Sequence, residues 1–163
     1  MNLDYKKIFK GLNKAKIDYL VVGGLAVNFH GIPRMTYDLD LMLLLESNNI
    51  LNMVAKLNKW GYRPRAPVDP RDLADTAKRE SWIVEKGMKA FSFSSPSSPI
   101  GEIDLVVEAP IPYDQLKARA MIITLEEEGI PVISLEDLIT VKAAAGRHQD
   151  LMDIEHLQRI RKK

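Results

Sequence analysis

The stretch Arg34-Met-Thr-Tyr-Asp-Leu-Asp-Leu-Met-Leu-Leu-Leu45 carries two acids, Asp38 and Asp40, at the start of an apolar run. The run predicts a buried β-strand over residues 39–45. Because side chains alternate along a strand, the two carboxylates project from the same face, about 6–7 Å apart along the backbone. That geometry is suited to holding a divalent metal ion.

A strand and a glycine pair precede these acids. Tyr19-Leu-Val-Val22 predicts a buried strand that ends at Gly23 and Gly24, and residues 25–30 predict a short helix. A glycine pair at a strand-to-helix turn has two interpretations. It provides a permissive backbone, or it lets backbone N–H groups and a helix N-terminus approach a phosphate closely. The pair alone does not decide between them.

A second pair of acids has the same spacing. Glu102 and Asp104 open the apolar stretch 102–107, which predicts a β-hairpin with residues 89–94. A carboxylate in a strand suited to burial is costly unless it is paired, hydrogen-bonded or bound to a cation. The two doublets therefore predict one shared site if their strands are neighbours. Oxygen ligands with no cysteine and few histidines favour Mg²⁺ or Mn²⁺ over zinc.

A simpler explanation of these acids also exists. Acids at strand ends face solvent or pair with arginines, and Arg34, Arg63 and Arg65 are available for pairing. The two explanations differ in their response to metal. An ion that binds the folded state raises thermal stability, whereas acids already paired with arginine leave it unchanged.

Composition limits the classes of protein to consider. The 163 residues include 23 basic and 22 acidic side chains, so the net charge of +1 does not indicate a nucleic-acid partner. The absence of cysteine excludes a disulfide framework, a thiolate zinc site and a cysteine nucleophile. The N-terminal residues lack the apolar core of a signal peptide, and no apolar stretch approaches the roughly 18 residues of a membrane span. We expect a cytoplasmic protein without a membrane segment.

Length and periodicity predict one domain over residues 1–163, with residues 134–163 as a helical C-terminal segment packed on it. Alternating strand-like and helix-like stretches indicate an α/β (α+β) fold, a mixed β-sheet flanked by helices. Residues 62–72 look irregular. The other predicted strands are residues 82–85, 122–125 and 130–133. The other predicted helices are residues 5–14, 47–60, 73–78, 113–120 and 134–145, and a further helix follows Gly146. Ser47 and Ser134 are the predicted N-caps of the helices at 47–60 and 134–145.

Together, the glycines and acids resemble the nucleotidyltransferase superfamily that shares the DNA polymerase β catalytic fold. Its pattern is a glycine pair, a strand with Asp-x-Asp and a third acid on a later strand. Gly23-Gly24, Asp38-Leu-Asp40 and Asp104 match each part. Residues 134–154 are similar to a small bacterial subgroup related to AbiEii-type toxins and minimal nucleotidyltransferases. The resemblance covers nearly the whole chain and is least at residues 62–89.

The resemblance implies that an NMP is transferred from an NTP such as ATP to an acceptor hydroxyl, with release of pyrophosphate. Asp38 and Asp40 would carry Mg²⁺ or Mn²⁺ and share one ion with Asp104, which would help to deprotonate the hydroxyl. Two such ions stabilise the attacking and the leaving oxygen. The phosphates would lie near Gly23, Gly24 and Arg34. Thr36 is a further phosphate candidate, although a β-branched residue that leads into a strand needs no such role.

Two basic residues near the C-terminus extend this candidate site. Lys142 lies on the same helical face as Leu135, Leu138 and Ile139, so it points inward. It either extends along the apolar surface or has a function, and the resemblance favours a triphosphate contact. Arg147 is a weaker candidate, because its three-residue spacing to two acids, Asp150 and Asp153, also fits a surface ion-pair ladder.

The acceptor is not identified by these residues: RNA, a protein side chain or a small molecule would each offer a hydroxyl. The resemblance also implies a partner protein in a toxin–antitoxin pair. The alternative from another class is a non-catalytic nucleotide-binding or toxin–antitoxin interaction module with the same fold. The complete set of acids argues against that module, because a degenerate copy is free to lose one.

Overall fold

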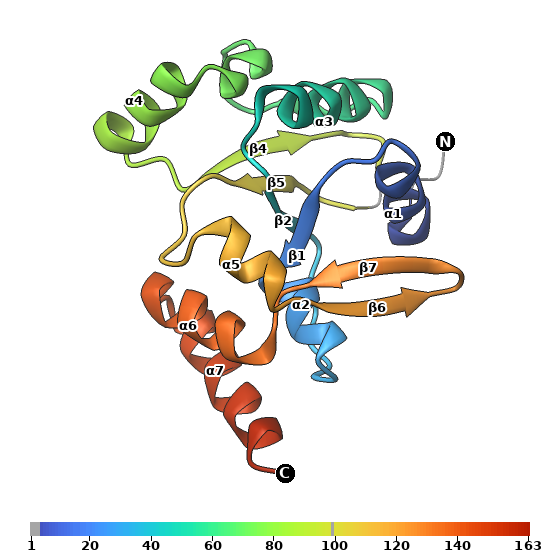
Figure 1. Cartoon of the computed structure of the whole chain (residues 1–163), viewed down its shortest axis with the longest axis vertical. Coiled ribbons are helices and arrows are strands. Elements are labelled where there is room, and N and C mark those ends of the chain that lie inside the picture. Colours follow the sequence, from blue (N-terminus) through green and yellow to red (C-terminus); the bar gives the residue numbers. More distant parts are fainter. Residues whose placement is uncertain (1–3, 99) are drawn as a thin grey trace.

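One mixed β-sheet of seven strands organises the molecule (Figure 1). The computed structural model describes residues 4–98 and 100–163. The strand order is β3-β4-β5-β2-β1-β7-β6. The strands are β1 (Tyr19–Val22), β2 (Leu39–Leu43), β3 (Arg63–Pro64), β4 (Ala90–Ser94), β5 (Ile103–Val106), β6 (Met121–Leu125) and β7 (Glu128–Val132). The predicted mixed sheet with flanking helices is confirmed.

Helices lie beyond both ends of this sheet. In Figure 1, α3 and α4 lie at the top, and α6 and α7 lie at the bottom near the C-terminus. The helices are α1 (Tyr5–Lys14), α2 (Gly23–Phe29), α3 (Ser47–Lys59), the 3₁₀ helix η1 (Pro70–Ala74), α4 (Thr76–Lys86), α5 (Tyr113–Ala118), α6 (Leu135–Ala145) and α7 (His148–Arg161). No described helix combines the length and the apolar character that crossing a bilayer requires.

The centre of the sheet positions the acids. Strand β2 pairs antiparallel with β1 and parallel with β5. In the second pairing Asp40 lies directly opposite Asp104. Apolar side chains on both strands, including Leu39, Leu41 and Ile103, are buried in the core. The two strands that carry acids are therefore neighbours, as the shared site required.

Three predictions about residues 47–85 are wrong. No single helix spans residues 73–78, because η1 ends at Ala74 and α4 begins at Thr76. Residues 82–85 are not a strand but part of α4, because Asp75 accepts a hydrogen bond from the Lys78 N–H at its start and Gly87 ends it in a left-handed conformation. Ser47 does not cap α3: it is the first helical residue, and its hydroxyl donates to the Ala74 carbonyl. The Ser134 cap of α6 is confirmed, with its Oγ 3.1 Å from the Asp137 N–H.

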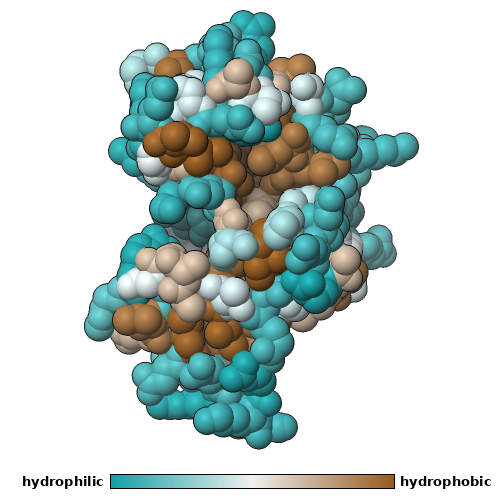
Figure 2. Space-filling model, turned by 60° about the vertical axis from the view of Figure 1, so that its left-hand side comes forward, coloured by the Kyte–Doolittle hydropathy of each residue, from teal (hydrophilic) through white to brown (hydrophobic). Residues whose placement is uncertain are grey.

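Figure 2 shows one face of the molecule coloured by hydropathy. Hydrophilic side chains cover most of this face, and hydrophobic patches interrupt them in both the upper and the lower half. Large exposed apolar side chains in the described chain include Met35 and Tyr37, which lie three residues and one residue before Asp38.

Candidate active site

Four carboxylates converge at the beginning of β2 and β5. Asp38 and Glu102 each lie just before a strand, and Asp40 and Asp104 each lie within one. One carboxylate oxygen from each of Asp38, Glu102 and Asp104 lies within 4.8 Å of the other two. Glu102 was not among the predicted metal ligands, although its spacing from Asp104 was a visible signal. Hard oxygen donors in this number fit Mg²⁺ or Mn²⁺.

The chain before β5 wraps closely around Asp38. The Glu102 N–H donates to Asp38 Oδ1 over 2.8 Å, and the Gly101 N–H donates to the Tyr37 carbonyl over 2.7 Å. A Cβ atom at Gly101 would lie 2.5 Å from Asp38 Oδ1. Glycine at this position therefore allows the two acid-bearing segments to approach each other.

The innermost pair of acids is electrostatically strained. Burial, the negative charge of Asp104, a side-chain hydrogen bond with Asp104 and the charge of Asp38 raise the pKa of Asp40 to about 7. Asp104 Oδ1 is buried and has no hydrogen-bond partner among the described residues. A polar atom of this kind is costly unless a ligand or ion satisfies it.

Arginine does not neutralise the three predicted ligands. Among residues 4–98 and 100–163, no ion pair involves Asp38, Asp40 or Asp104, whereas Glu102 pairs with Arg65. Arg63 donates instead to backbone carbonyls. The simpler explanation, acids paired with arginines, therefore describes Glu102 only.

The glycine pair packs directly against these acids. Gly23 joins β1 to α2 with a φ of +67°, and a Cβ atom there would overlap the carboxylate of Asp40. A Cβ atom at Gly24 would lie 2.9 Å from Thr36 Oγ1 and 3.2 Å from Arg34 Cζ. Close packing and a positive φ thus require glycine at Gly23, whereas a Cβ at Gly24 would crowd only the side chains of Thr36 and Arg34. The turn places Arg34 and Thr36 next to the acid cluster.

Replacing Gly23 by alanine is expected to destabilise the protein more than the same change at Gly31. Both glycines have positive φ, which costs an alanine about 1–2 kcal/mol, but nothing lies within 4 Å of a Cβ at Gly31. Overlap with Asp40 adds roughly 1–3 kcal/mol at Gly23. Urea unfolding of both variants measures the difference, and equal destabilisation would contradict this packing.

Lys142 is buried, as its helical face predicted, and its partners are two buried acids. Its Nζ lies 2.9 Å from Asp153 Oδ2 and 3.3 Å from Asp150 Oδ1. The exposed fractions are 5% for Lys142, 2% for Asp150 and 1% for Asp153. The interpretation of Asp150 and Asp153 as a surface ladder is therefore wrong. Their spacing to the buried Leu157 on α7 was the signal for an inward face.

The same network reaches the loop before β2. Asp153 Oδ2 also accepts a 2.6 Å hydrogen bond from Arg34 Nη1, so one oxygen binds cations from α6 and from this loop. Arg147 is mostly exposed and pairs with Asp150 through a 2.8 Å contact. The positive charge of Lys142 lowers the pKa of Asp40 against the larger effects that raise it. The basic network and the acid cluster are therefore parts of one region.

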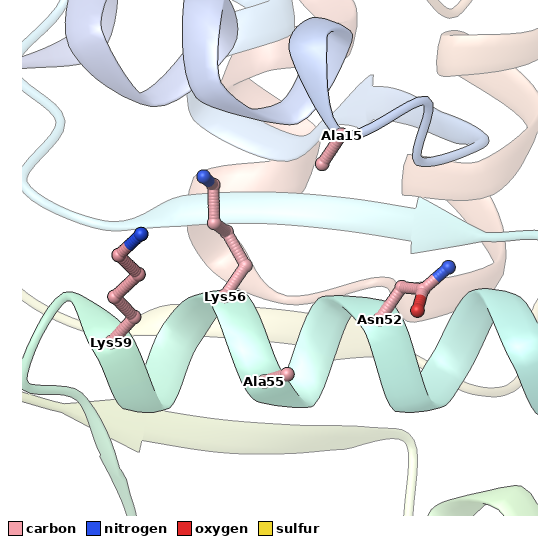
Figure 3. A pocket seen from close by; sticks show the side chains of 5 residues that line it. All are labelled: Ala15, Asn52, Ala55, Lys56 and Lys59. Carbon is pink, nitrogen blue, oxygen red and sulfur yellow. The ribbon is translucent and has the colours of Figure 1, made fainter.

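A separate surface pocket shares no residue with the acid cluster. Its volume is about 280 Å³, and it is lined by Ala15, Asn52, Ala55, Lys56 and Lys59. Figure 3 shows the lysine side chains extending from α3 toward the end of α1. This shallow basic pocket lies outside the predicted site.

The fold and the site define the class of this protein. Adjacent parallel strands carry Asp-x-Asp and a third acid, and a glycine pair at the β1–α2 turn packs against them. These are the features expected of a nucleotidyltransferase. Comparison with known proteins now gives the family.

The chain belongs to the AbiEii family, described as the nucleotidyl transferase AbiEii toxin of a type IV toxin–antitoxin system, whose model matches residues 12–162. It is a nucleotidyltransferase by family. No curated protein matches the chain.

Solved structures show the same fold at low identity. The lincosamide antibiotic adenylyltransferase LnuA, solved with lincomycin bound, superposes with a TM-score of 0.62 and 17% identity over 98% of this chain and 99% of that one. The antibiotic-resistance factor ANT(2″)-Ia superposes with a TM-score of 0.58 and 14% identity, over 95% of this chain and 78% of that one. A nucleotidyltransferase-like protein from Paracoccidioides brasiliensis superposes with a TM-score of 0.52 and 17% identity, over 92% of this chain and 71% of that one.

Proposed function

We propose that this chain transfers an NMP from an NTP to an acceptor hydroxyl and releases pyrophosphate, in a reaction that requires Mg²⁺ or Mn²⁺. The observation that carries the proposal is the convergence of Asp38, Glu102 and Asp104, with Asp40 directly opposite Asp104 and a buried, unpartnered oxygen on Asp104. Membership of the AbiEii family and the nucleotidyltransferase fold support the type of reaction.

Asp38, Asp40 and Asp104 would hold the divalent metal. Oxygens of Asp38 and Asp104 lie within 4.8 Å of each other, Asp40 lies directly opposite Asp104, and the described arginines leave all three acids unpaired. When bound, the metal supplies positive charge for the attacking and the leaving oxygen. The orphaned Oδ1 of Asp104 is the atom whose environment fits such an ion best.

The side chains of the protein position the reactants and accept a proton. Asp104 would help to take the proton of the acceptor hydroxyl from its position on β5 directly opposite Asp40. The triphosphate would lie along the turn at Gly23 and Gly24, beside Arg34 and Thr36. Catalysis is then mostly positioning and electrostatic stabilisation, and no side chain acts as a nucleophile.

The basic network would supply the remaining positive charge for the phosphates. Two of the three N–H donors of Lys142 are engaged by Asp150 and Asp153, which leaves one for a phosphate oxygen. The exposed Arg147 would contribute from the start of α7. Lys142 therefore acts chiefly as a fixed charge, and Arg34 as the more accessible contact.

The acceptor is an RNA, a protein or a small molecule that carries a free hydroxyl. LnuA was solved with lincomycin bound and ANT(2″)-Ia with adenylyl-2″-tobramycin, which supports a small-molecule acceptor. Membership of the AbiEii toxin family supports action within a toxin–antitoxin pair. The shared chemistry is attack of the acceptor oxygen on the α-phosphorus of the NTP.

Incubation of the purified protein with each α-labelled NTP, Mg²⁺ and cell extract tests the proposal. We expect label to appear on an extract component, and chelation of the metal to prevent it. Binding of NTP without any transfer would support a non-catalytic module instead. If neither Mg²⁺ nor Mn²⁺ raises the melting temperature, the metal assignment is wrong, because an ion that binds the folded state must stabilise it.

A further inference from the structure

We propose that Glu102 is a fourth carboxylate of the metal site and that Arg65 is the counter-ion which a bound divalent cation displaces from it. This inference rests on the proposed metal site and assigns a role to the segment that follows β3. It concerns residues outside the Asp-x-Asp strand and the third acid.

The position of Glu102 supports a role as a ligand. One of its carboxylate oxygens belongs to the group that lies within 4.8 Å together with oxygens of Asp38 and Asp104. Its own backbone N–H holds Asp38 Oδ1 at 2.8 Å. Glu102 is therefore fixed to the cluster through its backbone, while its side chain pairs with Arg65. The buried, unpartnered Oδ1 of Asp104 is an independent sign that this cluster binds a cation, because such an atom is costly unless an ion or ligand satisfies it.

Arg65 reaches the cluster from the edge of the sheet. Its backbone N–H donates to the Ser92 carbonyl over 3.0 Å, which anchors the residue beside β4. Its guanidinium Nη1 pairs with Glu102 Oε1. In the described part of the chain, this is the one ion pair made by any of the four clustered carboxylates, so Arg65 is the cation that a metal ion meets at the cluster.

The solvent exposure of the Arg65–Glu102 pair determines whether Glu102 stays paired with Arg65 or binds a divalent ion. The side chains of Arg65 and Glu102 are 61% and 29% exposed, and solvent-exposed ion pairs are weak. A divalent ion that several carboxylates hold at once competes successfully with such a pair. The guanidinium nevertheless opposes the ion, because it neutralises one carboxylate and adds positive charge next to the cluster.

Mn²⁺ binding to the nucleotide-free protein, measured from the loss of the free-ion EPR signal at fixed pH and low salt, tests this competition. We expect Arg65→Gln to tighten Mn²⁺ binding by about two- to fivefold, which corresponds to the free energy of an exposed ion pair. Glu102→Gln should weaken it by roughly tenfold, because the number of charged ligands sets the affinity of such sites.

Matched controls come from two pairs outside the cluster. Arg71→Gln removes an arginine that pairs with Asp69, and Glu108→Gln removes an acid that pairs with Lys89. Arg71→Gln should not tighten Mn²⁺ binding as Arg65→Gln does, and Glu108→Gln should not weaken it as Glu102→Gln does. In the Glu102→Gln background, Arg65→Gln should have no more effect than Arg71→Gln, since the carboxylate for which it competes is gone.

Unchanged or weaker Mn²⁺ binding by Arg65→Gln would overturn the inference, and so would wild-type affinity in Glu102→Gln. If the wild-type protein binds Mn²⁺ but Arg65→Gln does not tighten the binding and Glu102→Gln does not weaken it, this inference fails and the proposed metal-dependent reaction is unaffected. Wild-type protein that binds no Mn²⁺ would overturn both. Thermal unfolding of each variant checks the fold, and because Arg65 is exposed, its variant carries the test even if Glu102→Gln misfolds.

Discussion

The Asp40→Asn variant is expected to lose nucleotidyl transfer and, without metal, to be more stable than the wild type at pH 8. Asparagine cannot supply the charged oxygen that the proposed metal site needs, so transfer should fall on the order of a thousandfold or more. The stability gain has a separate cause. Asp40 is buried next to Asp104, which makes its ionisation unfavourable.

The sign of the pH dependence follows from the direction of the shift. The pKa of Asp40 rises from 3.8 to about 7 in the folded protein, so the folded state holds this proton more tightly than the unfolded state. Stability is therefore lost as the pH rises from about 4 to 7, and the whole penalty of a few kcal/mol is present above pH 7. Asp40→Asn removes that penalty at pH 8 and changes little at pH 4.

Urea unfolding at both pH values in the presence of a chelator measures the gain, and label transfer with metal at pH 8 measures the loss. Glu127→Gln, which changes an exposed acid in the β6–β7 turn, is the control and should affect neither. Asp40→Asn that is less stable than wild type at pH 8 would show that the carboxylate is favourably ionised in the fold, which contradicts the crowding of acids described above.

The Lys142→Met variant is expected to be destabilised by about 3–5 kcal/mol, the cost of leaving buried charges without their partner. Methionine keeps the length and apolar stem of lysine but removes the one ammonium that lies between Asp150 and Asp153. Both carboxylates are almost fully buried, so solvent cannot replace it. For a chain of this size the melting temperature should fall by roughly 6–20 °C.

Thermal and urea unfolding of Lys142→Met at pH 7 measure this loss. Lys10→Met is the matched control, because Lys10 is exposed on α1, and its replacement should change the free energy of unfolding by less than about 0.5 kcal/mol. A loss below about 1 kcal/mol at Lys142 would mean that Arg34 and Arg147 are sufficient to neutralise the two acids.

Local sequence signals were enough to predict how the acids lie on their strands. The two-residue spacing of Asp38 and Asp40, repeated at Glu102 and Asp104, puts each doublet on one face of its strand regardless of the rest of the fold. Apolar flanks around both doublets indicated buried strands, but only the fold decides whether these strands are neighbours. The pairing of Asp40 with Asp104 is the structural result.

What local signals missed depends on contacts between distant segments. Asp150 and Asp153 follow Arg147 at a spacing that fits a solvent-exposed face as well as a buried one, and only the packing of α6 on α7 shows that Lys142 lies opposite them. Residues 82–85 are apolar enough for a strand, but the Asp75 cap and Gly87 continue a helix through them. Arg65 lies in a stretch rich in proline and arginine, where no periodicity indicates that it reaches Glu102.

The single oxygen of Asp153 that holds both Lys142 and Arg34 ties the last helix to the loop that leads into the proposed metal site. A deletion that removes α7 before this residue would take away the partner of the Arg34 side chain in the loop that leads into Asp38, even though every acid of the cluster would still be present. We therefore expect truncation of α7 to disturb the proposed active site.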